Sequence, residues 1–465
     1  MEYVGLRIVK ILNCTILFVS LICLAMCSQS LAIEEIEQSP NIKVEQSQQK
    51  ALVGKINFED ILKTAKEHSY DLQIADYNIL ISQQGVRGAK SEYFPHFNLG
   101  GGMEYTKNFR DIRESTVMSI GDAFINPYTR YQSVLGITVA YNLFDFGVRG
   151  GNLKIAKEDV ELKKLETKEK LQELNLTLLD SYTKILITSK QIELNRRILG
   201  VEEKNLNMKE RLFSAKEISG MELNDERVKI NNIKSKIAEL NSIRVEALNW
   251  LSFYTGEEYD VTKLKVADLN KTDFDVLAFK DYTKSIIWKI HEKNIKKKEL
   301  ELRVVVRNNY PKLNAYGRYY LYGSDHNNYA QSLGIEPSNF SVGASLSMPI
   351  FDGFKNSADI AKTRLELKQL QVERDKAIAQ LAARLAAMRS NLIYLDEQID
   401  ENNKAIVELS DKEKSLKKLS SRKLISAIEE NDAMIDLLNK QIELDKNTIT
   451  HTAITRGIQI LTEEM

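Results

Sequence analysis

Two segments of the chain alternate apolar residues with small or polar ones at a period of two. In residues 131–143 the odd-numbered positions are mostly apolar, and in residues 340–350 the even-numbered positions are. This is the period of a β-strand with one apolar face. Each segment follows a Tyr- and Gly-rich segment across a polar loop. The pattern predicts two strand pairs, the hairpins 96–144 and 312–351.

Each predicted strand pair is followed by a long stretch of helical periodicity. An aliphatic residue recurs every seven positions after residue 148 and again after residue 355, which gives a narrow apolar seam for coiled-coil packing. A continuous helix over residues 148–214 is on the order of 100 Å long at 1.5 Å per residue. The seam resumes after a turn in each copy, which predicts two long antiparallel helical hairpins, 148–251 and 355–460. The seam residues are Leu171, Leu178, Ile185, Ile192, Leu199 and Leu206, then Ile378, Leu385, Leu392, Ile399 and Ile406.

The two halves of the chain carry the same motifs at a constant offset. Phe144-Asp145 recurs 207 residues later as Phe351-Asp352, and several other motifs share this offset. Self-similarity of this kind indicates two structural repeats. Each repeat begins with a predicted helix that ends near a proline, Pro95 or Pro311, because the residue before a proline disfavours the helical conformation.

The N-terminus has the layout of a secretory signal peptide. Arg7 and Lys10 precede an apolar run, and Ser30-Leu31-Ala32 offers small residues for cleavage, so we expect residues 1–32 to be removed. An uncleaved membrane anchor is the alternative, since the run is nearly long enough to span a bilayer. All three cysteines of the chain lie in this segment, and the lipidation of one of them is left open: Cys14, Cys23 and Cys27.

The remaining chain is organised around the repeats. A linker over residues 33–55 leads to the first repeat, 56–278, and the second repeat follows over residues 279–465. Within the first repeat, an equatorial segment over residues 252–278 follows the helical hairpin. The predicted fold class is mixed α and β, mainly α.

Charge and composition argue against nucleic-acid binding and against catalysis. Lys and Arg number 65, as do Asp and Glu, so no net charge favours nucleic acid, and the run Lys296-Lys297-Lys298 is typical of a solvated helix face. The five histidines are scattered singly, without metal-ligand spacing. No nucleophile, phosphate-binding loop or oxyanion donor accompanies them. We therefore expect no enzyme activity, no cofactor and no bound metal.

The strand pairs raise the question of how they close. The alternation fits strands between lipid and water, and it also fits an ordinary half-buried hairpin. Strands in a bilayer must close into a barrel because an open edge leaves backbone groups unpaired in hydrocarbon. Four strands are too few, since about eight are needed even for a barrel filled by side chains. Several copies in cyclic symmetry must then contribute four strands each. Three copies provide twelve strands and room for water.

The order of these segments resembles the TolC-type outer-membrane efflux family. Helix, Tyr93-Phe94-Pro95, strand pair, Phe-Asp turn, long helix and returning helix follow one another, and the order occurs twice between Phe58 and the C-terminus. The resemblance implies a homotrimer with a twelve-stranded transmembrane β-barrel and a periplasmic α-barrel of coiled-coil hairpins. The chain departs from the family pattern at Asn142, where the second repeat has Pro349, and at Ala427, where glycine is frequent.

The resemblance also implies a location and a function. The location is the outer membrane of a Gram-negative bacterium, in contact with its lipid and with a large periplasmic portion. The function is that of a passive export duct in a tripartite efflux or type I secretion system. Its partners are a periplasmic adaptor (membrane fusion) protein and an inner-membrane transporter. The sequence leaves the cargo and the identity of the pump open.

In this family, acidic residues at the tip of the second repeat surround the narrowest point of the channel. They correspond to Glu429 and Asp432, and their first-repeat counterparts are Glu222 and Asp225. Rings of carboxylates favour cations, although acids are also common in the first turn of any helix. Two basic residues before this tip are candidate gate partners, Arg422 and Lys423.

A soluble periplasmic coiled-coil adaptor or scaffold is the alternative function. Such a protein shares the export signal and the heptads of this chain. It lacks Tyr-rich alternating hairpins and has Gly-rich lipoyl-like segments instead. The two strand pairs therefore favour the channel.

Overall fold

The computed structural model describes residues 55–107, 118–120, 123–125, 130–260, 264–270, 282–422 and 424–462. These residues belong to one compact unit, Leu52–Met465. The expected signal peptide, with Cys27, lies outside the described residues, as does the expected linker except for Lys55. In the described part of the chain, every helix is too short or too polar to cross a bilayer.

The two predicted strand pairs form one antiparallel sheet. Its order is β2 (His96–Tyr105), β5 (Tyr131–Phe144), β7 (Lys312–Asp325) and β8 (Glu336–Ser347). The first repeat supplies β2 and β5, the second supplies β7 and β8, and the repeats meet where β5 pairs with β7. Within the described residues, β2 and β8 each pair along one side only. The sheet therefore has two open edges.

The register of the sheet produces one apolar and one polar face. Residues directly opposite each other in an antiparallel pair lie on the same face. Ile137 of β5 lies opposite Leu99 on one side and Tyr319 on the other, and Tyr319 lies opposite Phe340. The next residue, Thr138, lies opposite Asn98 and Arg318. The alternation read from the sequence thus extends coherently across all four strands.

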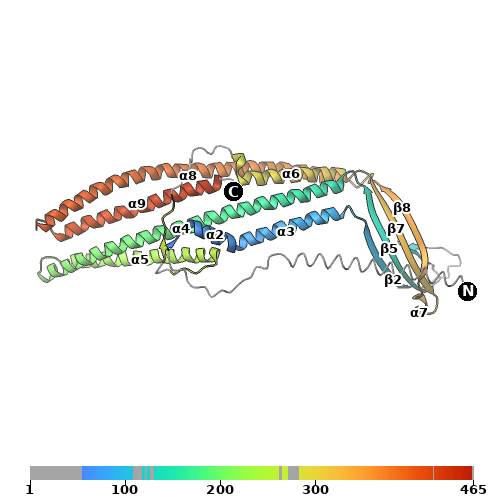
Figure 1. Cartoon of the computed structure of the whole chain (residues 1–465), viewed down its shortest axis with the longest axis horizontal. Helices are drawn as coiled ribbons and strands as arrows, with labels where there is room; N and C mark the ends of the chain where they lie inside the picture. Colours follow the sequence, from blue (N-terminus) through green and yellow to red (C-terminus); the bar gives the residue numbers. More distant parts are fainter. Residues whose placement is uncertain are drawn as a thin grey trace. The chain divides into compact units, whose positions relative to one another are not determined.

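Helices make up most of the described chain, as predicted. Each repeat has a shorter helix before its strand pair and a helical hairpin of 67 and 36 residues after it. The hairpin turns lie at one end of this unit and the sheet lies at the other (Figure 1). The helices are α2 (Phe58–His68), α3 (Tyr70–Ser91), α4 (Val148–Ser214), α5 (Gly220–Thr255), α6 (Ile286–Arg307), α8 (Lys355–Ser421) and α9 (Ala427–Thr462). Short elements complete the list: β1 (Lys55–Ile56), β3 (Met118–Ile120), β4 (Ala123–Ile125), β6 (Lys265–Val266), the 3-10 turn Tyr282–Lys284 and α7 (Tyr329–Ser332).

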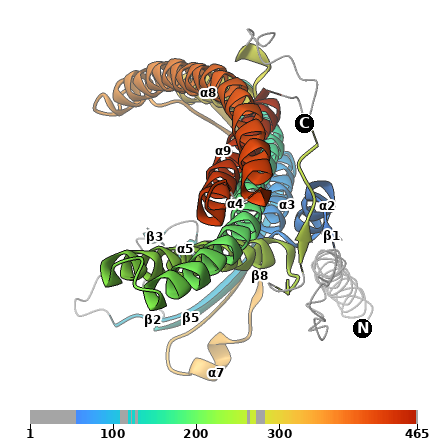
Figure 2. The same ribbon diagram turned by 90° about the vertical axis from the view of Figure 1, so that its left-hand side faces the viewer.

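Helix α4 occupies the centre of the helical layer. It packs against α3, α5, α6 and α9, whereas the main partners of α8 among the described helices are α6 and α9. Seen from the hairpin turns, α5, α4, α9 and α8 follow one another (Figure 2). Near the sheet the order is α3, α4, α6 and α8. Helix α8 is therefore the outer helix of the layer at both ends.

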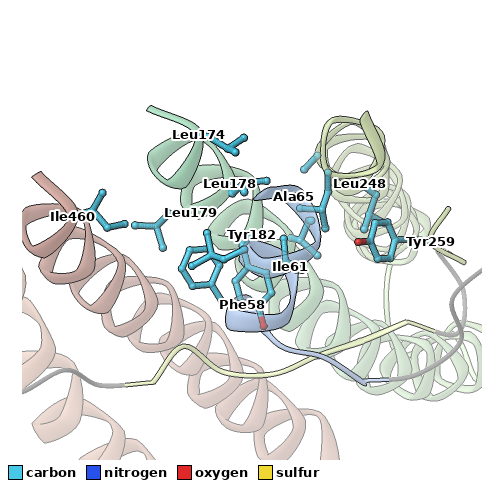
Figure 3. Packing of buried hydrophobic residues seen from close by; sticks show 14 residues of the cluster. Phe58, Ile61, Ala65, Leu174, Leu178, Leu179, Tyr182, Leu248, Tyr259 and Ile460 are labelled. Atoms are coloured by element: carbon cyan, nitrogen blue, oxygen red, sulfur yellow. The ribbon is translucent and has the colours of Figure 1, made fainter. Parts of the chain in front are cut away.

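The largest hydrophobic cluster joins α4 to α2, α5 and α9 (Figure 3). Tyr182 lies at its centre with its side chain fully buried, and its hydroxyl donates a hydrogen bond to the carbonyl oxygen of Ala267 at 2.6 Å. Burial raises the pKa of this hydroxyl, so Tyr182 stays neutral. The bond satisfies the buried hydroxyl and ties the segment after β6 to α4. The cluster fixes the middle of the helical layer.

Candidate gate and channel wall

The four candidate gate carboxylates lie in the first two turns of the two returning helices. Glu222 lies in the first turn of α5 and Glu429 in the first turn of α9, and Asp225 and Asp432 follow three residues later in each helix. Both hairpin turns lie at the same end of the unit (Figure 1). All four side chains are exposed. The structure therefore places the predicted gate residues together at one end of the helices, facing solvent.

Glu222 has a structural partner that the gate hypothesis did not require. The hydroxyl of Ser219 accepts a hydrogen bond from the backbone N–H of Glu222 at 3.2 Å, and the Glu222 carboxylate accepts one from the backbone N–H of Ser219 at 3.5 Å. This reciprocal arrangement is a capping box. It satisfies two N–H groups that the first turn of α5 leaves without helical partners. Glu222 thus stabilises the start of α5.

The second hairpin turn is capped less completely. The hydroxyl of Ser426 accepts a hydrogen bond from the backbone N–H of Ile428 at 3.1 Å. Arg422 is the capping residue that follows α8, and no ion pair among the described residues joins it to Glu429 or Asp432. Lys423, the other candidate gate partner, lies outside the described residues.

Asp432 is tied to the first hairpin. The side-chain amide of Asn205, on α4, donates a hydrogen bond to Oδ1 of Asp432 at 3.3 Å. The same amide nitrogen donates to Oε2 of Glu202 at 3.2 Å, and Oδ1 of Asn205 accepts from the amide of Asn431 at 2.7 Å. Asn205 is buried, and both its N–H groups and its oxygen are used. It therefore links one candidate gate carboxylate to the interior of the first hairpin.

This link continues into a buried pair of glutamates that the sequence interpretation missed. Glu226, on α5, is 1% exposed and lies against Glu202, which is 5% exposed. Lys209 donates to Oε2 of Glu226 at 2.7 Å, and Lys229 lies 3.5 Å from the same oxygen. Oε1 of Glu226 is buried and has no hydrogen-bond donor among the described residues when both glutamates are ionised. The two carboxyl groups thus form the core of a polar network across α4, α5 and α9.

The two glutamates have opposite pKa shifts. Burial, and then the hydrogen bond and charge of Glu226, raise the pKa of Glu202 to about 7. Burial opposes the charge of Glu226 as well, but the hydrogen bonds from Glu202 and Lys209 and the charge of Lys229 outweigh it and lower its pKa. Two facing carboxylates in a buried site cannot both ionise cheaply. The pair therefore holds one proton below neutral pH and loses it as the pH rises through the pKa of Glu202, about 7.

The sequence did contain a signal for this network. Glu226 lies seven residues before the aliphatic Ile233, and Glu202 lies three residues after the seam residue Leu199, at the complementary position of the heptad. Both therefore occupy positions that face a packed helix. A carboxylate at a seam position is costly unless it has partners. An acid at that spacing therefore indicates a buried polar network, which a seam defined by aliphatic residues alone does not reveal.

The polar face of the sheet carries flat-lying tyrosines. The Tyr320 ring covers Gly136, where an added Cβ would overlap the ring, and the Tyr316 hydroxyl lies 2.6 Å from the position of a Cβ on Gly343. Arg318 lies between these tyrosines in the strand, with its guanidinium 4.6 Å from the centre of the Tyr316 ring. Glycine at both positions lets the rings lie along the sheet.

Among the described residues, no group of three or more His, Cys, Asp or Glu side chains could hold a metal ion.

Comparisons with known proteins agree with this architecture. Residues 61–257 match the family model of the outer membrane efflux proteins. CusC has a TM-score of 0.71 at 14% identity, over 90% of this chain and 96% of that chain. VceC of Vibrio cholerae has a TM-score of 0.71 at 12% identity, over 87% and 96%. CmeC of Campylobacter jejuni, an outer-membrane channel, has a TM-score of 0.69 at 12% identity, over 87% and 86%.

At these identities the solved structures establish the fold, and the family match supplies the relationship in sequence. No curated protein sequence matches the chain significantly. The predicted class, mainly helical with a smaller β part, is confirmed. An outer-membrane location also argues against the alternative function, that of a soluble periplasmic adaptor. The resemblance noted from the repeats is confirmed as well: residues 61–257 match the outer membrane efflux protein family, and the chain has the fold of TolC-type channels, a class of passive channels rather than enzymes that is located in the outer membrane with a periplasmic portion.

Proposed function

We propose that three copies of the chain form an export duct of a tripartite efflux or type I secretion system. The observation that carries this proposal is the sheet, which has one apolar face, one polar face and two open edges. Its apolar face suits lipid and its polar face suits a water-filled lumen. The open edges require further strands, because unpaired backbone groups are costly in hydrocarbon. Edge β8 of one copy pairing with edge β2 of the next closes a ring.

Twelve strands from three copies give a barrel with room for water, whereas eight strands from two copies leave little lumen. The helices support the same cyclic arrangement. Helix α3 exposes apolar residues at Tyr70, Ile74 and Ile81, and α8 exposes Leu365, Val372 and others along its length. Both lie at opposite edges of the helical layer near the sheet. Contact between α3 of one copy and α8 of the next buries both stripes, in the same direction as the strand pairing.

The exposed hairpin turns support docking to a periplasmic adaptor. Phe213 and Met221 flank the turn between α4 and α5, and Leu424 lies in the turn between α8 and α9. They are 45%, 74% and 66% exposed. Apolar residues gathered at helix turns far from the membrane are typical of a protein contact rather than of solvent exposure. The inner-membrane transporter that drives export then lies beyond this adaptor.

Solved structures with this fold support conduction. CusC undergoes conformational changes that accompany transmembrane channel formation, and MtrE of Neisseria gonorrhoeae is an outer-membrane channel seen in its open state. We place the gate of the present chain at Glu429 and Asp432, with Glu222 and Asp225 beside them. Three symmetry copies of these carboxylates around one axis favour cations.

Purified protein in detergent tests the assembly. We expect a mass of three mature chains by light scattering, retention in the outer membrane after a carbonate wash, and discrete conductance steps in planar bilayers. A water-soluble monomer without detergent contradicts the proposal. Release by the carbonate wash supports a peripheral scaffold instead.

A double replacement tests the gate. Glu429→Ala with Asp432→Ala is expected to raise single-channel conductance or reduce cation preference, since it removes six carboxylates from a trimeric entrance. The matched control is Glu430→Ala, which removes an acid from the same first turn. Currents that are unchanged in the double variant, or changed equally by the control, exclude these two residues from the gate.

A further inference from the structure

The polar network between α4, α5 and α9 is complete only when it holds one extra proton. Oε1 of Glu226 is buried without a hydrogen-bond donor among the described residues, and Glu202 is the group facing it. A proton on Glu202 supplies that donor. Lys209 already bonds the other oxygen of Glu226, and Asn205 bonds Glu202. Every polar atom along this path then has a partner, as buried polar groups require.

The network ends on a candidate gate residue. Asn205 donates its second N–H to Asp432, and the side-chain oxygen of Asn205 accepts a hydrogen bond from Asn431. Asn431 and Asp432 both belong to α9, whereas Asn205 belongs to α4. The hydrogen bonds of Asn205 therefore join the gate-bearing helix of the second repeat to the first hairpin.

We propose that the proton shared by Glu202 and Glu226 positions Asn205 against Asp432, and so makes opening of the tip dependent on pH. Glu202, Glu226 and Asn205 are positioning residues in this proposal, acting on Asp432. The proposal rests on the channel function proposed above, and it adds a regulatory input to the same gate.

Loss of the proton changes the charge balance inside the network. The groups facing the pair are Lys209 on α4, Lys229 on α5 and, through Asn205, Asp432 on α9. With one proton, the ion pair of Glu226 with its lysines is undisturbed. Without it, two buried carboxylates face each other and repel. Separation of α9 from α4 admits water to Glu202 and relieves that repulsion. The flanking pairs Glu203–Lys234 and Glu210–Arg227 lie at the surface and do not enter the network.

The second repeat shows that helix packing does not demand these acids. At the same offset of 207 residues, Leu409 corresponds to Glu202 and Ala433 corresponds to Glu226. Apolar residues thus serve the equivalent positions of the second hairpin. A buried ionisable pair is often no more stable than apolar residues of similar size. Its presence in one hairpin only is consistent with a regulatory role.

The direction of the pH effect follows from the raised pKa of Glu202. A carboxyl whose pKa is higher in the packed state binds more protons there, so the packed state is favoured at acidic pH. Its advantage falls as pH rises from the usual glutamate value near 4.5 to about 7, and it is constant above that. The network therefore holds α9 most firmly in acid and least firmly above neutral pH.

Single-channel recording between pH 5.5 and 8.5 tests the proposal. We expect the open-to-closed ratio of the wild type to rise with pH. The change is about tenfold for each unit by which opening lowers the pKa of Glu202. Glu202→Gln supplies a permanent amide donor to Glu226, so its ratio stays low and loses this pH dependence. Asn205→Ala breaks the link to Asp432, so its ratio stays high at every pH. The matched control, Glu239→Gln, removes an exposed acid from α5 and keeps the wild-type profile.

The difference in pH profile between the wild type and Glu202→Gln isolates the contribution of the network. Equal profiles for these two proteins overturn the inference while leaving the channel function intact. Absence of any wild-type conductance contradicts the channel function itself.

A structural measurement then decides the inference without conduction. Residues from 33 onward contain no cysteine, so spin labels at Asn207→Cys on α4 and Asn439→Cys on α9 report their separation in detergent. The distance is expected to increase with pH in the otherwise native chain and to stay constant with Glu202→Gln. A distance that does not respond to pH rejects the inference.

Discussion

The two helical hairpins share one sequence pattern and occupy different surroundings. Helix α4 lies between two neighbouring helices at either end of the layer, whereas α8 is the outer helix of the layer. Leu186 on α4 and Ile393 on α8 are equivalent by the 207-residue offset, yet they are 2% and 61% exposed. The same aliphatic position is therefore core in one repeat and surface in the other.

The difference shows that a repeat in sequence does not mean a repeat in burial. The helices of the chain form one layer, in which α4 lies between other helices and α8 lies at the edge. Helix α8 exposes many aliphatic residues, including Leu365, Val372 and Val407. This is more exposed apolar surface than an ordinary solvent-facing helix carries. In the proposed trimer these residues meet the next copy. The first hairpin thus stabilises the protomer, and the second stabilises the assembly.

Paired substitutions at the equivalent positions give the largest expected effect. Leu186→Ala removes a buried side chain from the centre of the layer and is expected to cost about 2–5 kcal/mol of unfolding free energy. Ile393→Ala is expected to change protomer stability by less than about 0.5 kcal/mol, and to lower the temperature at which trimers dissociate on gels. Circular dichroism melts and gel mobility separate these two effects.

Ala386→Ser on α8 is a suitable control, since it changes polarity on an exposed turn without removing a large side chain. Equal losses of protomer stability for Leu186→Ala and Ile393→Ala refute the distinction between the hairpins. A trimer of Ile393→Ala that dissociates at the wild-type temperature places the neighbouring copy elsewhere.

The periodicities in the sequence predicted the elements well for a physical reason. A strand with one apolar face and a helix with a seven-residue seam both leave their period in the sequence, and the boundaries of β5 (Tyr131–Phe144) and α4 (Val148–Ser214) lie where the period changes. The 207-residue offset further related the two copies. The periodicity of apolar residues identifies the apolar face of a helix or strand, and it depends only on the residues of that element.

Contacts that depend on which element packs against a given helix face were not predicted. The link from Asn205 to Asp432 joins residues 227 positions apart, and it depends on which helix packs beside α4. Periodicity does not identify that helix, nor does it show that Ile393 faces outward. Glu222 is a different case, because Ser219-x-x-Glu222 is a capping-box pattern visible in the sequence. That pattern indicates a structural role for Glu222 alongside its candidate role in the gate.

Glycine replacements in the sheet are expected to have a smaller effect on stability, and they again compare the first repeat with the second. Gly136→Ala places a methyl group against the Tyr320 ring, and Gly343→Ala places one against Tyr316. Each change is expected to cost about 1–3 kcal/mol, because the ring must move off the sheet. The control is Gly100→Ala, directly opposite Gly136 on β2, where nothing lies within 4 Å.

Unfolding of the purified protein in guanidinium measures these costs. Replacing Tyr320 by alanine in the Gly136→Ala background is expected to remove most of the cost of the methyl group, relative to Tyr320→Ala alone. A loss of stability in Gly100→Ala as large as in Gly136→Ala shows that the effect comes from strand conformation and not from the tyrosine.

The two hairpin turns give the smallest effect. Ser219→Ala removes the capping box of α5 and is expected to cost about 0.5–2 kcal/mol, whereas Ser426→Ala removes one hydrogen bond at 3.1 Å and is expected to cost less. Hydrogen exchange at the first turns of α5 and α9 measures the difference locally, where global unfolding is too coarse. Ser219→Asp is the matched control, because aspartate caps as well as serine and restores protection. A larger loss of protection in Ser426→Ala than in Ser219→Ala contradicts this expectation. The start of α9 would then depend more on its capping hydrogen bond than the start of α5 does.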